Sequence, residues 1–169
     1  MIMENIFDDK FENEVRETMG GLFDLLTLDE IGRLKAIGFR EYEHSYVKGR
    51  SVTFTDSKDD RLMPDDNAVT VYKKNGLFYL ELCTIMHVAI DTTEILVEGA
   101  HSFEELKEAA VTALQNYLFA KAPFDENMMR QAVNRNPLEH EEIMAIGIDN
   151  AVNKTYAFLE RLRISLLSL

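Results

Sequence analysis

The sequence contains one cysteine, Cys83, and no tryptophan. A single cysteine excludes an intramolecular disulfide and a cysteine zinc cluster. No apolar run approaches the roughly 20 residues that a membrane-spanning helix needs, so we expect no membrane association. Met1–Lys10 carries three acidic residues and therefore does not resemble a signal peptide. Together these absences predict a soluble, cytoplasmic protein in a reducing environment.

Basic residues are scarce, with 18 lysines and arginines against 30 acidic residues and a net charge of −12 at pH 7. Sequence-independent binding to nucleic acid requires a basic surface, so direct contact with nucleic acid is disfavoured. A partner recognised through charge would instead be a basic protein. The simpler alternative is that the acidity serves solubility alone.

The familiar motifs of catalysis and cofactor binding are also missing. There is no glycine-rich phosphate loop, no Gly-x-Ser-x-Gly turn and no His-Glu-x-x-His helix. Residues 41–44 and 98–101 match Glu-x-x-His, but that spacing brings two metal ligands together only on a helix. Both segments fall on a predicted strand or loop. We therefore expect no catalytic residues, no metal site, no cofactor and no enzymatic activity.

The composition is that of a globular protein, with 46% hydrophobic and 28% charged residues over 169 positions. We expect one domain spanning residues 1–169. Apolar residues follow a helical period over about 4–37, with Phe7, Phe11 and Val15 four positions apart. Residues 27–30 form a capping-box sequence that opens a helix with Leu28, Ile31 and Leu34 inward.

The apolar period changes to two between residues 39 and 98. Strands are predicted at 39–47, 50–55, 68–74 and 77–86, with a further one within 87–98. Asn75-Gly76 is a strong hairpin signal. Consecutive strands predict an antiparallel meander of four to five strands within an α+β fold.

Helical spacing returns over about 102–169. Ser102 begins a second capping box, Asn136-Pro137 begins a later helix, and Gly147 is a candidate break. The stripe of Leu159, Leu162 and Leu166 and an uncharged C-terminal hexapeptide predict a homo-oligomer formed through the C-terminal helix.

Acidic residues concentrate in two segments. Residues 1–30 hold nine acidic residues against two basic ones, and residues 51–66 add five aspartates. Such asymmetry is typical of an interaction segment. We expect the following residues to contact a basic partner: Asp8, Asp9, Glu12, Glu17, Asp59, Asp60, Asp65 and Asp66. The alternative is a solvated face with no partner.

A second candidate site lies on the strand predicted at 39–47. A period of two places Arg40, Tyr42, His44 and Tyr46 on one face. These side chains could bind an anionic ligand, stack a base or supply an acid and a base. The alternative is a half-covered sheet face whose side chains bury their apolar bodies and expose their polar tips.

Three functions follow from these observations. The first is a protein-binding module, an inhibitor, immunity or antitoxin-like factor that masks the basic, nucleic-acid-binding surface of a partner. The second is a small-ligand-binding protein or enzyme that uses the strip from Arg40 to Tyr46. The third is a structural subunit of a larger assembly.

Overall fold

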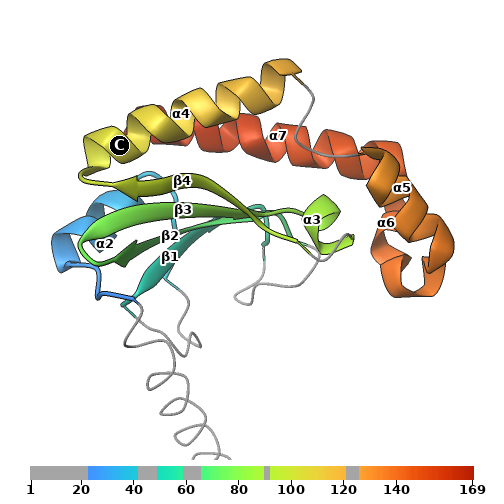
Figure 1. Ribbon diagram of the computed structural model, residues 1–169, viewed down its shortest axis with the longest axis horizontal. Coiled ribbons are helices and arrows are strands. Elements are labelled where there is room, and N and C mark those ends of the chain that lie inside the picture. The colour runs from blue at the N-terminus through green and yellow to red at the C-terminus, as the bar shows by residue number, and fades with distance from the viewer. Residues whose placement is uncertain (1–22, 42–48, 59–65, 90–91, 121–125) are drawn as a thin grey trace, which may run out of the picture.

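The computed structural model describes residues 23–41, 49–58, 66–89, 92–120 and 126–169. Four strands and seven helical segments follow one another along this part of the chain (Figure 1). Their bounds are α2 Leu28–Ala36, β1 Ser51–Thr55, β2 Ala68–Lys74, β3 Leu77–Cys83, α3 Ile85–Ala89, β4 Glu94–Ala100, α4 Phe103–Ala120, α5 Glu126–Arg135, η1 Pro137–His140, α6 Glu141–Ile146 and α7 Ile148–Leu167. The predicted α+β class is confirmed.

The four strands form one sheet in the order β1-β2-β3-β4, and each strand is antiparallel to its neighbour. The predicted meander is therefore confirmed. The hairpin between β2 and β3 turns at Asn75-Gly76, where both residues have positive φ, 53° and 77°. Asparagine and glycine tolerate this conformation better than other residues, which is why the local sequence marked the turn.

The sheet has an apolar inner face and a mixed outer face. In β3, Phe78, Leu80 and Leu82 are buried, and the residues between them are half-buried. Helices α4 and α7 lie side by side across one face of the sheet (Figure 1). On the outer face, Tyr72 stacks on Tyr79 with ring centroids 5.3 Å apart.

Helix α2 begins with the predicted capping box. The Thr27 hydroxyl accepts the Glu30 N–H, and the Glu30 carboxylate accepts the Thr27 N–H. Ile31 and Leu34 are buried as expected, but Leu28 is 90% exposed, so its inward placement is wrong. Each step of three residues turns about 300° around a helix, which leaves Leu28 roughly 120° away from Leu34.

The strand predicted at 77–86 ends at Cys83, because Ile85–Ala89 form the short helix α3. The Thr84 hydroxyl accepts the His87 N–H, and the His87 Nδ1 accepts the Thr84 N–H. This reciprocal pair starts the helix in the manner of a capping box. Ile85 and Met86 are both buried, and a continuous apolar run does not distinguish a buried strand from a buried helix.

The C-terminal helices follow the predicted boundaries closely. Ser102 caps α4, and Gly147, with φ of 87°, separates α6 from α7. Asn136 precedes the 3-10 turn η1 and makes no side-chain cap. None of the described helices is long and apolar enough to cross a bilayer.

Helix α7 packs along α4, and this contact occupies the leucine stripe that we expected to form an oligomer interface. Leu159, Leu162 and Leu166 are fully buried in the core of the same chain. The stripe is therefore not available to a second copy. Ile164 and Leu167 of the C-terminal hexapeptide remain about half exposed, so the homo-oligomer stays a prediction that rests on the hexapeptide alone.

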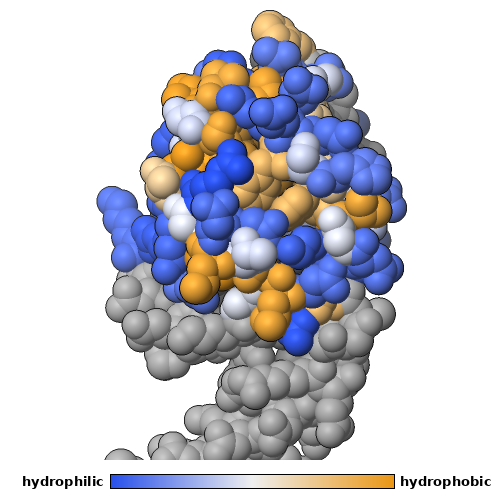
Figure 2. Space-filling model, turned by 90° about the vertical axis from the view of Figure 1, so that its left-hand side faces the viewer, coloured by the Kyte–Doolittle hydropathy of each residue, from blue (hydrophilic) through white to orange (hydrophobic). Residues whose placement is uncertain are grey.

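Apolar side chains also remain on the surface. At the end of the molecule that carries the C-terminus, apolar patches are separated by hydrophilic side chains (Figure 2). The large apolar residues of the described ranges that are at least half exposed are Leu25, Leu28, Phe119, Met128, Leu138, Met144 and Ile164. The end seen in Figure 2 thus presents no continuous apolar face of the kind that obligate interfaces bury.

Candidate functional site

Most of the residues predicted to bind a partner lie outside the described ranges. Of the eight acidic candidates, only Asp66 is described, and it is half-buried just before β2. Within the strip, Arg40 is described, whereas Tyr42, His44 and Tyr46 are not. Arg40 is exposed, and its backbone pairs with Thr53 of β1 through N–H to O distances of 2.7 and 2.9 Å. Both predicted sites therefore stay predictions.

Asp56 and Asn67, on either side of the residues 59–65 that the structure does not describe, are joined by hydrogen bonds. The two carboxylate oxygens of Asp56 accept the backbone and side-chain N–H groups of Asn67, at 3.0 and 2.9 Å. The side-chain Oδ1 of Asn67 in turn accepts the Ile85 N–H at 3.1 Å and the Thr155 hydroxyl at 3.4 Å. Asn67 is fully buried and ties β2 to α3 and α7. Among the described residues no group of three or more His, Cys, Asp or Glu is placed to hold a metal ion.

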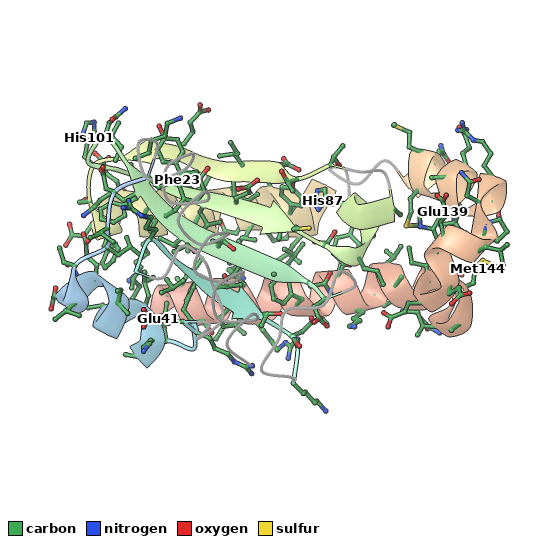
Figure 3. The ribbon with its side chains drawn as sticks, turned by 90° about the horizontal axis from the view of Figure 1, so that it is seen from below. Phe23, Glu41, His87, His101, Glu139 and Met144 are labelled. Carbon is green, nitrogen blue, oxygen red and sulfur yellow. The ribbon has the colours of Figure 1, made fainter. Side chains whose placement is uncertain are left out.

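A hydroxyl and a carboxylate lie near the imidazole of His87, which belongs to α3 and is labelled in Figure 3. The Thr84 hydroxyl lies 2.9 Å from His87 Nδ1, and His87 Nε2 lies 3.8 Å from Glu94 Oε2. Burial lowers the pKa of His87 to about 4. A general base works best with a pKa near the operating pH, and the pKa of His87 is well below neutral. The Thr84 side chain is fully buried and accepts a hydrogen bond from the backbone of α3, so it is not accessible to a substrate. This trio is suited to capping α3 and not to catalysis.

Cys83 is half-buried at the end of β3. Burial raises the pKa of its thiol, and the charge of Glu81 raises it further. Reactive cysteines have lowered pKa values in electropositive surroundings, so this environment fits a packing role.

A groove of about 360 Å³ lies between β4 and α4. Apolar atoms and backbone come from Leu96, Val97, Gly99, Ala100 and Ala109. Three acidic residues, which we call the groove glutamates, complete the lining: Glu98, Glu105 and Glu108. A groove lined by both small apolar residues and glutamates can accept a long basic side chain, because the stem packs on apolar atoms while the charge meets a carboxylate.

The local sequence explains why the groove forms here. Helix α4 begins three residues after β4 ends, so the chain reverses within a short turn and returns along the same strand. Gly99, with φ of 75°, lies at a register irregularity of β4 opposite Phe78 and Tyr79. Glycine adopts this backbone conformation without the steric cost that a side chain would add. At the start of α4, the Glu105 carboxylate accepts the His101 N–H at 2.7 Å, which fixes one side of the groove.

The groove is negatively charged and is not neutralised by described cations. Within the described ranges, Glu98 and Glu108 form no ion pair. Lys107, between two groove glutamates in sequence, hydrogen-bonds the Leu169 carbonyl at 3.4 Å. Burial raises the pKa of Tyr72, and the charges of Glu81, Tyr79 and Glu98 raise it further, so Glu98 acts electrostatically on the outer face of the sheet.

β4 is also an edge of the sheet. It pairs with β3 on one side, and no described strand lies on its other side. The opposite edge differs, because Arg40 forms a backbone bridge with Thr53 of β1. An edge strand presents N–H and C=O groups that can pair with another chain.

Sequence reasoning noticed two of the groove glutamates but gave them other roles. Glu98 belonged to a Glu-x-x-His match, and Glu105 to a capping box. The spacing of three between Glu105 and Glu108 places both on one side of a helix. That spacing does not tell which strand the helix accompanies.

Comparison of the chain with protein-family models, with curated proteins and with solved structures finds no match.

Proposed function

We propose that this protein is an acidic protein-binding module that holds a basic protein partner in the groove between β4 and α4. The observation that carries the proposal is the set of three groove glutamates beside an apolar lining, none of which has an ion pair within the described ranges. An exposed ion pair contributes at most about 1 kcal/mol, so recognition requires several carboxylates acting together with apolar contacts.

The charge of the whole chain supports the same partner. A net charge of −12 attracts a basic protein from solution and repels nucleic acid. The predicted contacts at Asp8, Asp9, Glu12 and Glu17 would add to this attraction, because residues 1–30 hold nine acidic residues. An inhibitor, immunity or antitoxin-like factor that masks a nucleic-acid-binding surface would act in this way.

The proposal is tested by charge reversal in the groove. The test variant is the pair Glu98→Lys and Glu108→Lys, which leaves the capping contact of Glu105 in place. The matched control is Glu139→Lys with Glu141→Lys, two exposed acids in η1 and α6 that change the net charge equally. Circular dichroism verifies that both variants are folded.

The probe is a labelled peptide of about eight alternating lysine and valine residues, long enough to follow one strand. We expect the groove variant to bind it at least about tenfold more weakly than the control variant, at an ionic strength of about 0.1 M. Equal weakening in both variants would mean that only the overall charge matters, and the groove would not be the binding site.

A further inference from the structure

Two features that point to a mode of binding coincide along β4. Five consecutive residues of this strand, 96–100, line the groove, and the same strand is the sheet edge with no described neighbour. We propose that the partner contributes an extended, lysine- or arginine-rich segment that pairs with β4 as a fifth strand. This inference rests on the proposed function, because it specifies how the basic partner is held.

The backbone of β4 supplies the attachment. A peptide that joins a sheet edge forms main-chain hydrogen bonds that do not depend on its sequence, and its side chains provide specificity. The seven residues of β4 extend over about 23 Å, enough to pair with a segment of similar length. Helix α4, with 18 residues, extends over about 27 Å and can accompany such a segment.

The side chains of an added strand would meet carboxylates on both of its faces. Successive side chains of a strand point to opposite sides of the sheet. On the side of α4 they meet Glu105 and Glu108. On the outer face they meet Glu98, whose register partner is Tyr79 of the stacked tyrosine pair. Basic residues at alternate positions of the segment would therefore face either Glu105 and Glu108 or, with the strand shifted by one residue, Glu98.

The same edge disfavours a second copy of this chain as the occupant. Antiparallel pairing of two β4 strands about Leu96 would place Glu94 of each copy opposite Glu98 of the other, and like charges across strands are destabilising. Two register irregularities, opposite Phe78/Tyr79 and Leu80/Glu81, also distort the strand. Irregular, charged edges are how proteins prevent self-pairing of sheets. A basic segment would not be repelled by these glutamates, so we propose that it, and not a second copy, pairs with the β4 edge.

The experiment compares two peptides of equal charge. The first is the alternating lysine-valine peptide, and the second has the same sequence with its central backbone nitrogens methylated, which removes the hydrogen-bond donors on both edges. Binding is measured by fluorescence anisotropy, and amide hydrogen exchange locates any protected strand. We expect methylation to weaken binding at least about tenfold, and we expect the unmodified peptide to slow exchange in β4.

The outcomes separate this inference from the proposed function. Equal binding of both peptides, with loss of affinity in the Glu98→Lys, Glu108→Lys variant, would overturn strand addition and leave the acidic groove as the binding site. Protection of β1 in place of β4 would overturn strand addition at this edge. Failure of both peptides to bind, or equal binding to the groove and control variants, would overturn the proposed function together with the inference.

Discussion

His87 is the residue whose protonation should affect stability most clearly. Its side chain is 5% exposed, and burial lowers its pKa to about 4, below the 6.5 of an exposed histidine. As the pH falls from 6.5 to 4, the unfolded chain takes up a proton that the folded chain does not. The free energy of unfolding should therefore fall across this interval, by up to about 3 kcal/mol.

The free energy of unfolding is measured by urea denaturation of the wild type and of His87→Gln at several pH values between about 7.5 and 4. The variant should be less stable at neutral pH, because it loses the reciprocal contact with Thr84, but its stability should decline less on acidification. The control is His101→Gln, which changes an exposed histidine at the other end of the sheet (Figure 3). A decline of equal size in wild type and His87→Gln would contradict the assignment to His87.

Two glycines with open space around them differ in backbone conformation. Gly76 has φ of 77°, and Gly32 lies within α2; a Cβ at either position would meet no atom within 4 Å. Gly76→Ala should lower the free energy of unfolding by about 1 kcal/mol, because the left-handed conformation is costly for alanine. Gly32→Ala should raise it by about 0.5–1 kcal/mol. Equal effects of the two substitutions in urea unfolding would contradict the hairpin geometry.

At the scale of elements, the sequence predicted what local chemistry determines. Caps at Thr27 and Ser102, the turn at Asn75-Gly76 and the break at Gly147 all depend on residues a few positions apart. The end of β3 was missed, because Ile85 and Met86 are buried in α3 as they would be in a strand. The leucine stripe of α7 was assigned to a second copy, because no local pattern shows that α4 of the same chain covers it.

Neighbouring leucines at the end of α7 test this packing. Leu166 is fully buried, whereas Leu167 is 48% exposed. Leu166→Ala should lower the free energy of unfolding by about 2–5 kcal/mol, and Leu167→Ala by less than about 1 kcal/mol. Thermal unfolding of both variants should not depend on protein concentration, because the buried stripe is intramolecular. A concentration-dependent Tm that Leu166→Ala abolishes would return the stripe to an intermolecular interface.

At the scale of the whole molecule, the acidic composition and the lack of catalytic motifs in the sequence favoured a basic protein partner. Composition alone did not indicate which part of the surface would bind that partner. The sequence directed attention to the aspartates of two segments. The groove arises instead from α4 returning along β4, and this places Glu98 of β4 along the same groove as Glu105 and Glu108 of α4. A single sequence does not show which helix packs along which strand. Each of these three glutamates can be seen in the sequence, but their common position along one groove cannot be predicted from it.

The central claim is that a basic segment binds in the groove between β4 and α4. The most direct measurement is a titration of the isotopically labelled protein with the lysine-valine peptide, followed through its backbone amide signals. We expect the largest shifts to fall within residues 94–109, with smaller changes in β3, and to diminish at high salt because screening weakens the ion pairs. Shifts confined to α5 and α6, or no saturable shift at low salt, would contradict the account.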